Sequence, residues 1–222
     1  MLPRDGGGVI IRMDPNKLAH GYLDAKEYIL DKGYERELDW QTNRSFNDLE
    51  ESEFLQEIAW VVLVSGFRES VVRRLFPAIT EAFYYWQNTD EILCHLSDCR
   101  SNAFAVFANP KKIDAICSII TSVASDGFPH VKRLIKEDGL QYLITFPMIG
   151  PISGVHLLKN IGFPVAKPDR HLVRIASSAG FVSVTDLCMT IQAITGDAIS
   201  EVDYVLWRYA TLKHDYLVTF QI

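Results

Sequence analysis

The residues best suited to chemistry lie between Leu140 and Phe181, where a tight turn is followed by a lone carboxylate. The turn reads Phe-Pro-Met-Ile-Gly-Pro from Phe146 to Pro151 and joins two segments with helical spacing. A helix that begins directly after such a turn directs free backbone N–H groups outward, and these groups bind anions such as phosphate. Gly150 is the position at which we expect a positive φ that lets a phosphate approach closely.

The carboxylate is Asp169, in the segment Lys-Pro-Asp-Arg-His-Leu-Val-Arg at 167–174. A carboxylate stabilises positive charge that develops on a substrate, and it can orient or deprotonate water. Asp169 also follows a proline and precedes an apolar helical pattern, which is the position of a helix N-cap. The catalytic role and the capping role are compatible.

The turn and the Asp169 segment, in this order and at this spacing, resemble the helix-hairpin-helix superfamily of DNA glycosylases. The signature of that superfamily is a Leu-Pro-Gly-Val-Gly-like hairpin followed at a short distance by Val-Asp-Thr-His-Val-x-Arg. Here the hairpin reads Phe-Pro-Met-Ile-Gly at 146–150 and the second segment reads Pro-Asp-Arg-His-Leu-Val-Arg at 168–174. The matching positions of the second segment are Asp169, His171 and Arg174. The similarity covers roughly residues 50 to 212 and leaves residues 1–50 unplaced.

The resemblance implies an all-α, two-lobed fold in a single domain, residues 1–222, with the hairpin motif at 140–160 and a DNA-binding cleft between the lobes. It implies a DNA repair enzyme that extrudes a damaged or modified base from double-stranded DNA and hydrolyses its bond to the sugar. Breaking that bond builds positive charge on the sugar, and Asp169 is the implied catalytic carboxylate. Alkylated purines, oxidised purines and mismatched pyrimidines all stay open as substrates.

Two departures from the superfamily pattern bear on the reaction. Bifunctional members carry a nucleophilic lysine at the start of the second hairpin helix, where this chain has Ile152, which cannot form a Schiff base. The cysteine cluster of the iron–sulfur members is missing as well. We therefore expect a monofunctional glycosylase. Met148 stands in place of the first hairpin glycine, which leaves the turn geometry open.

Three alternatives stay open beside this interpretation. The first is a bifunctional glycosylase/lyase that uses another amine, such as Lys159 or Lys167. The second is a catalytically silent module of the same fold that binds damaged DNA. The third is a helical scaffold unrelated to DNA, which would show no salt-dependent DNA binding.

The resemblance also implies which side chains meet DNA. The residues expected to contact DNA are Met148, Ile149, Gly150, Ile152, Ser153, Phe67, Arg68, Lys111 and His171, with Phe67 or Arg68 filling the gap left by the extruded base. The residues expected to stack on that base are Trp60, Tyr204 and Trp207, with Trp40 as a further candidate. Trp60 and Trp207 lie in apolar helical patterns that equally suit core packing, and His171 equally suits a local hydrogen bond.

The composition fits a globular protein, with 48% hydrophobic and 23% charged residues. The net charge of −6 weighs mildly against a nucleic-acid partner, although a cleft can be locally basic in an acidic protein. The four cysteines form no CxxC pair, so we expect buried thiols rather than disulfides, a metal site or an iron–sulfur cluster. No organic cofactor is implied. The resemblance implies at most a structural monovalent cation at the hairpin carbonyls.

The sequence shows no signal-peptide pattern and no apolar run long enough to span a bilayer. We therefore expect a soluble intracellular protein, cytoplasmic or, in a eukaryote, nuclear, that has no membrane partner and acts as a monomer.

The elements that must position these residues are helices, because apolar residues recur at helical spacing and no sustained alternation appears. A short strand at Val9–Arg12 is the one exception considered. The expected helices span Ser52–Val64, Ser70–Trp86 with a break considered at Pro77, a short helix capped by Thr89, one opened by Asn109–Pro110, Val131–Lys136, Gly139–Thr145, Ser153–Asn160, Asp169–Ala179, Val184–Thr195 and Ser200–Leu212.

Overall fold

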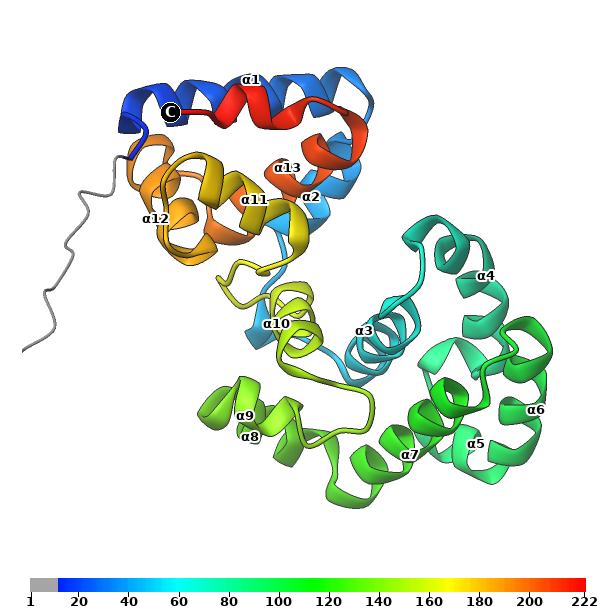
Figure 1. Cartoon of the computed structure of the whole chain (residues 1–222). Coiled ribbons are helices and arrows are strands. Elements are labelled where there is room, and N and C mark those ends of the chain that lie inside the picture. Colours follow the sequence, from blue (N-terminus) through cyan, green and yellow to red (C-terminus); the bar gives the residue numbers. More distant parts are fainter. Residues whose placement is uncertain (1–11) are drawn as a thin grey trace, which may run out of the picture. The chain divides into compact units, whose positions relative to one another are not determined.

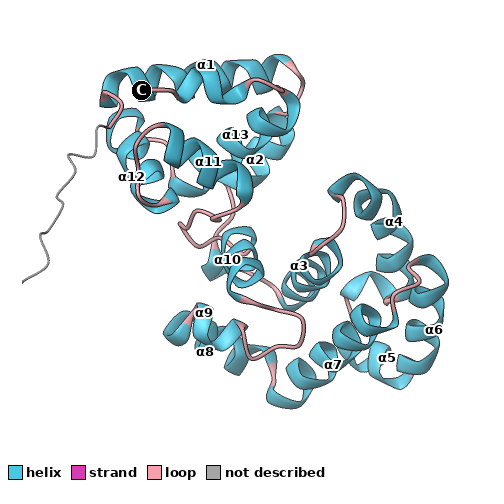
Figure 2. Ribbon diagram, in the orientation of Figure 1, coloured by secondary structure: helices cyan, strands magenta, loops and turns pink. Residues whose placement is uncertain are grey.

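The computed structural model describes residues 12–222, which form thirteen α-helices, three short 3₁₀ helices and no β-strand (Figure 1 and Figure 2). The all-α expectation is confirmed for this part of the chain. The strand considered at Val9–Arg12 lies, except for Arg12, outside the described residues. None of the described helices combines the length and the apolarity that crossing a bilayer requires.

The described chain divides into two compact units. Unit 1 combines the described residues up to Asn43 with Pro164–Ile222, and unit 2 is Arg44–Phe163. The helices of unit 1 are α1 (Pro15–Asp31), α2 (Glu35–Thr42), α11 (Arg170–Ser178), α12 (Val184–Thr195), α13 (Ile199–Leu212) and η3 (Tyr216–Phe220). The helices of unit 2 are η1 (Phe46–Asp48), α3 (Glu51–Val64), α4 (Glu69–Ala82), η2 (Tyr84–Trp86), α5 (Thr89–Cys94), α6 (Leu96–Val106), α7 (Pro110–Asp126), α8 (Phe128–Asp138), α9 (Leu140–Leu143) and α10 (Pro151–Asn160).

Unit 1 is built around α1 and α13, which contact each other and both contact α12. The side chain of Asp14 accepts hydrogen bonds from the N–H groups of Asn16 and Lys17 and so caps α1. The apolar residues of α1 that face the core recur at helical spacing: Leu18, Tyr22, Ala25 and Ile29. Figure 1 shows α1 running beside the C-terminal η3, which α1 also contacts. The segment that the sequence left unplaced therefore supplies part of the core of unit 1.

Unit 2 is organised around α3, which contacts α4, α7 and α10. The residues of α3 that fill this core are Phe54, Leu55, Ile58, Ala59, Val61, Val62 and Leu63. All four cysteines of the chain are free thiols, and three of them are buried as expected for small apolar side chains. No group of three or more His, Cys, Asp or Glu side chains in residues 12–222 is arranged to hold a metal ion.

The helix expected at Ser70–Trp86 differs from the prediction at its end. Helix α4 continues through Pro77 but stops at Ala82, and residues 84–86 then take left-handed φ values of 49°, 55° and 63°. The left-handed backbone of each such non-glycine residue lowers the folding stability by about 1–2 kcal/mol. The compensation is the burial of Phe83 and Trp86, whose rings stack with centroids 4.8 Å apart. Aromatic packing therefore overrides the helical pattern here.

The helix expected to be capped by Thr89 is capped one residue earlier, by Asn88, and Thr89 is its first residue. The side chain of Asn88, not of Thr89, accepts the hydrogen bond from the N–H of Glu91, at 3.1 Å. Thr89 instead donates to the carboxylate of Glu51, at 2.7 Å. Asparagine is the better N-cap of the two residue types, and the hydroxyl of Thr89 is engaged by Glu51 instead.

A buried acid joins α3 to the end of α10. Asn160 Nδ2 donates to Glu57 Oε2 at 2.9 Å, and the guanidinium of Arg44 lies 3.6 Å from Glu57 Oε1. Arg44 also binds the Asn160 carbonyl and the carboxylate of Glu53. Burial raises the pKa of Glu57 to about 7, although its bonds to Asn160 and the charge of Arg44 oppose the shift.

This raised pKa predicts a loss of stability with increasing pH. The folded protein disfavours the ionised Glu57 carboxylate, so the loss begins near the ordinary pKa of glutamate and is complete above about pH 7. A shift of this size corresponds to about 3 kcal/mol of unfolding free energy. In Glu57→Gln, which stays neutral, we expect this part of the loss between pH 5 and pH 8 to disappear. Urea unfolding at the two pH values measures it, and parallel pH profiles of mutant and wild type would contradict it.

Candidate functional site

The hairpin motif is formed by α9, a turn and α10, all in unit 2. Helix α10 packs closely against α9 at Gly154, where an added Cβ atom would lie 2.5 Å from Leu140 Cδ1. The turn is fixed from inside by Ile149, whose side chain is buried in the unit 2 core. Met148 and Ile152 flank it and are 46% and 55% exposed. The sequence-predicted hairpin is thus present, with its apex on the surface.

The backbone of the turn corrects the expectation for Gly150. Gly150 has a φ of −105°, which any residue adopts, and the left-handed position is Met148 with a φ of 65°. The residue after Met148, Ile149, has its side chain buried in the unit 2 core. The structure therefore places the conformation that favours glycine at the position where the resembled superfamily has one.

The N–H groups available to an anion are fewer than the sequence suggested. The N–H of Ile149 donates to the Phe146 carbonyl at 3.2 Å, and the N–H of Gly150 donates to Ser153 Oγ at 2.7 Å. Pro151 has no N–H. The first-turn N–H groups of α10 that lack an acceptor within the helix are those of Ile152 and Ser153. An anion at the apex would meet these two.

The strained turn yields a prediction for Met148→Gly. Left-handed backbone costs a non-glycine residue about 1–2 kcal/mol, and glycine removes that cost while adding about 0.5–1 kcal/mol of unfolded-state entropy. We expect a net gain of up to about 1 kcal/mol in unfolding free energy, measured by urea denaturation.

The matched control is Gly150→Ala, because its Cβ atom would lie 4.0 Å from Ser153 Oγ, an ordinary contact. This variant should fold with unchanged or slightly raised stability. If both Gly150→Ala and Met148→Gly lowered the unfolding free energy, the left-handed residue of the turn would be Gly150 and not Met148.

Asp169 is the N-cap of α11 in unit 1, as its sequence position predicts. Its Oδ1 accepts hydrogen bonds from the N–H groups of His171 at 2.8 Å and Leu172 at 3.1 Å. Both capping bonds use one oxygen, and no described residue donates a hydrogen bond to Oδ2. The side chain is half-buried. The cap therefore fixes the orientation of the carboxylate and leaves its second oxygen for a further partner.

His171 makes the local contacts that were considered for it. Its Nδ1 lies 3.3 Å from the Tyr216 hydroxyl, and its ring meets the Tyr216 ring edge-on at 5.6 Å. Burial lowers the pKa of His171, the Asp169 carboxylate opposes the shift, and Arg170 and Arg174 add to it. The imidazole therefore packs beside Asp169 as a neutral group at pH 7.

The loop between α3 and α4 presents Phe67 and Arg68 to solvent. The Phe67 ring is 44% exposed, and its inner side rests on Phe107 with ring centroids 5.0 Å apart. The exposed Lys111 lies in the first turn of α7, whose N-terminal N–H of Lys112 is capped by Asn109. Unit 2 thus holds an exposed aromatic ring on a supported loop, with cationic side chains in the same unit.

Two of the expected base-stacking residues are engaged within their units. Trp60 meets Phe76 edge-on at 5.2 Å, and the Arg73 guanidinium stands 5.8 Å from its ring centre. Tyr204 is only 6% exposed, so its ring offers almost no surface to a base. Burial raises the pKa of Tyr204, and its hydroxyl donates to Glu37 at 2.8 Å.

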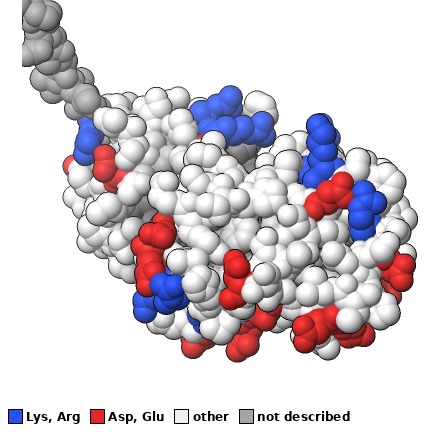
Figure 3. Space-filling model, turned by 90° about the horizontal axis from the view of Figure 1, so that it is seen from below, with Lys and Arg blue, Asp and Glu red and all other residues white. Residues whose placement is uncertain are grey.

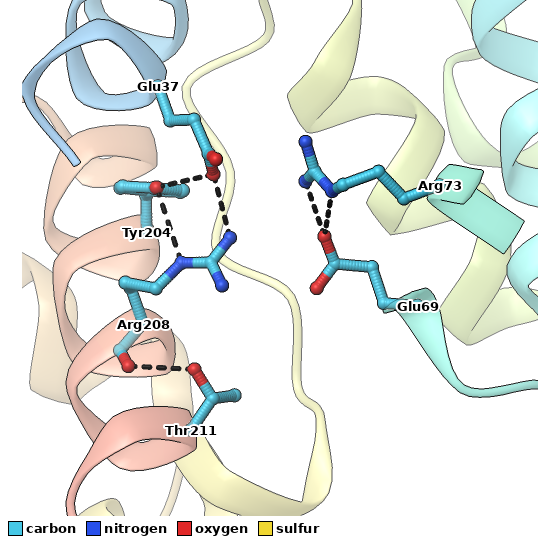
Figure 4. A network of polar contacts seen from close by, with 6 residues as sticks. All are labelled: Glu37, Glu69, Arg73, Tyr204, Arg208 and Thr211. Atoms are coloured by element: carbon cyan, nitrogen blue, oxygen red, sulfur yellow. Dashed lines mark hydrogen bonds and ion pairs between the residues drawn. The ribbon is translucent and has the colours of Figure 1, made fainter. Parts of the chain in front are cut away.

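The buried Arg208 belongs to the same network as Tyr204 and Glu37 (Figure 4), and its neighbour Trp207 is partly exposed. Arg208 donates to Glu37 at 2.7 Å and lies 4.5 Å from the Trp207 ring centre. The guanidinium also lies 4.4 Å from the Tyr34 ring centre. Among the expected stacking residues of unit 1, Trp207 is held by these contacts while it keeps part of its surface open, and Trp40 is exposed on α2.

Sequence reasoning missed one cation in unit 2. Lys112 is 3% exposed, and its ammonium group donates to the carbonyls of Val62, Leu63 and Ser65 at the end of α3. Burial lowers the pKa of this group. The signal was available, because helical spacing places Lys112 on the same face as the buried residues Ala115, Ile116, Ile119 and Ile120.

Charged side chains of both signs occur in separate small groups on the face drawn in Figure 3, and much of that face is uncharged.

No protein-family model matches the sequence, and no curated protein matches it. Two solved structures are similar over most of this chain. The 8-oxoguanine glycosylase/lyase of Methanocaldococcus jannaschii, in complex with a 15-mer DNA containing 8-oxoguanine, is 17% identical, with a TM-score of 0.61 over 88% of this chain and 98% of its own. The 8-oxoguanine DNA glycosylase of Thermotoga maritima is 16% identical, with a TM-score of 0.64 over 90% of this chain and 99% of its own. This chain therefore has the helical fold of these two DNA glycosylases.

Proposed function

We propose that this protein is a DNA repair glycosylase that removes a damaged or modified base by hydrolysing its bond to the sugar. The observation that carries the proposal is the capped carboxylate of Asp169, which follows the hairpin and keeps Oδ2 unbonded by the described residues. The expected charge on the sugar is positive, so a fixed carboxylate lowers the barrier by electrostatic attraction. The same oxygen can accept a proton from the attacking water.

The remaining groups supply DNA binding in this proposal. The N–H groups of Ile152 and Ser153 bind a backbone phosphate, a contact that carries no sequence information. Phe67 enters the stack where the base has left, which repays part of the cost of extrusion. In unit 1 we assign the stacking on the extruded base to Trp207, because its side chain is partly exposed.

The substrate class to test first is an oxidised purine. Both solved neighbours carry 8-oxoguanine in their names, and a shared fold supports the substrate only as a hypothesis. The experiment is a panel of duplexes, each with one modified base: 8-oxoguanine, an alkylated purine or a mismatched pyrimidine. Base release under single-turnover conditions from one class supports the proposal, and release from none contradicts it.

We predict that base release occurs without strand cleavage. Ile152 stands where a bifunctional enzyme needs its lysine, so the sugar is not attacked by an amine. The product DNA should stay intact until it is treated with hot alkali, and borohydride should trap no protein on DNA. Lys159 and Lys167 are the amines to examine by mass spectrometry if an adduct does form, since such an adduct would establish a lyase instead.

A silent damage-binding module is distinguished by the same panel. Such a protein binds one lesion more tightly than undamaged DNA but leaves its base in place. The unbonded Oδ2 of Asp169 favours the enzyme over this alternative.

A further inference from the structure

We propose that Lys112 is a positioning residue: its buried ammonium group ties down the end of α3 and holds the Phe67 ring in place for entry into DNA. The inference rests on the proposed function, since it concerns the loop that would fill the gap after base extrusion. Nothing in the sequence motifs assigns a role to this lysine.

The first support is the set of acceptors. The last carbonyls of a helix have no partner within the helix, and they form its negative end. Lys112 Nζ donates to Val62 O, to Leu63 O at 3.3 Å and to Ser65 O at 2.7 Å, so one group satisfies two of these carbonyls and that of the C-cap residue Ser65. The loop to Phe67 begins at Ser65, and the contact therefore anchors its first residue.

The second support is the contact with the ring itself. Lys112 Nζ lies 5.3 Å from the centre of the Phe67 ring, within the range of a cation–π interaction. The Phe107 ring also contacts the Phe67 ring, with centroids 5.0 Å apart. Phe67 is thus held by a cation and an aromatic ring while 44% of its surface stays exposed.

The third support is the absence of a simpler reason for the charge. No carboxylate among the described residues forms an ion pair with Lys112, and its burial lowers its pKa. A buried charge without a counter-ion costs stability, and an apolar side chain of similar length would avoid that cost. We therefore attribute the presence of a charged side chain at this buried position to its contacts with the three carbonyls and the Phe67 ring.

The first arm of the test needs no DNA. Lys112→Met keeps the length and flexibility of the side chain but removes its charge and donors. We expect faster amide hydrogen exchange at Ser65 and Phe67, whose N–H groups now bond to Val61 O and Val64 O. The matched control is Lys132→Met, because Lys132 Nζ also binds backbone carbonyls, those of Asn47 and Leu49. It should speed exchange near Leu49 and leave Ser65 and Phe67 unchanged.

The second arm is a double-mutant cycle with Phe67→Ala, read as single-turnover base release. If Lys112 acts through Phe67, Lys112→Met should slow release by about tenfold alone and less than about twofold in the Phe67→Ala background. Equal effects in both backgrounds, or unchanged exchange in the first arm, would overturn the proposal. If the wild-type protein releases no base, the proposed function fails and the role of Phe67 in DNA fails with it, while the exchange result still decides whether Lys112 orders the loop.

Discussion

Asp169→Asn is expected to slow base release by about 10³-fold or more while DNA affinity stays the same or rises. In the proposed reaction the substitution removes the negative charge that would stabilise the cationic sugar, and electrostatic contributions of this kind are among the largest in catalysis. The amide oxygen of asparagine can still accept the hydrogen bonds from His171 and Leu172, so α11 stays capped. Single-turnover release and fluorescence anisotropy measure the two quantities.

The matched control for this prediction is Asp14→Asn. Asp14 caps α1 with the same pair of hydrogen bonds, to the N–H groups two and three residues later, but it has no assigned part in the reaction. Its substitution should leave base release unchanged. If Asp169→Asn kept wild-type rates, Asp169 would be a structural cap like Asp14 and the catalytic assignment would be wrong.

Gly162→Ala is expected to lower the unfolding free energy of the protein by about 2–5 kcal/mol. Gly162 has a φ of +96°, and an added Cβ atom would lie 2.6 Å from Phe46 N and 2.8 Å from Ser45 C. Both atoms belong to the backbone, so they cannot turn aside as a side chain would. Conformational strain and overpacking therefore add. Urea denaturation followed by circular dichroism measures the loss.

The control separates strain from contact. Gly66, in the same unit, has a φ of +77° with nothing within 4 Å of an added Cβ atom. Gly66→Ala should therefore cost only the strain, about 1–2 kcal/mol. Equal losses for the two variants would mean that the contact with Ser45 and Phe46 contributes nothing.

The sequence predicted the helices best where a local cap is decisive. Helix α12 begins after the Ser183 cap and ends at Gly196, which takes a left-handed φ of 80°, so its bounds match the expectation. The opening of α7 at Asn109 and Pro110 matches for the same reason. In both cases a side chain or a glycine satisfies the terminal groups without help from the rest of the chain.

The sequence failed where distant packing decides. The left-handed residue of the hairpin is Met148 and not Gly150, and the residue after Met148, Ile149, is buried in a core that forms only on folding. Tyr204 became a buried donor because Glu37, far away in sequence, meets its hydroxyl. The carboxylate at Asp169 was recognisable because its cap and its motif are both local.

The order of the two units along the chain also bears on how the protein is made. Unit 2 is one continuous segment, whereas unit 1 joins residues before Arg44 to residues after Phe163. During synthesis, α1 therefore emerges with its apolar face uncovered, and its partners α12 and α13 follow only after all of unit 2 has been translated. Unit 2 can fold on the ribosome while the apolar face of α1 is still without its partners. In the nascent chain, α1 is therefore the segment that we expect a chaperone to bind.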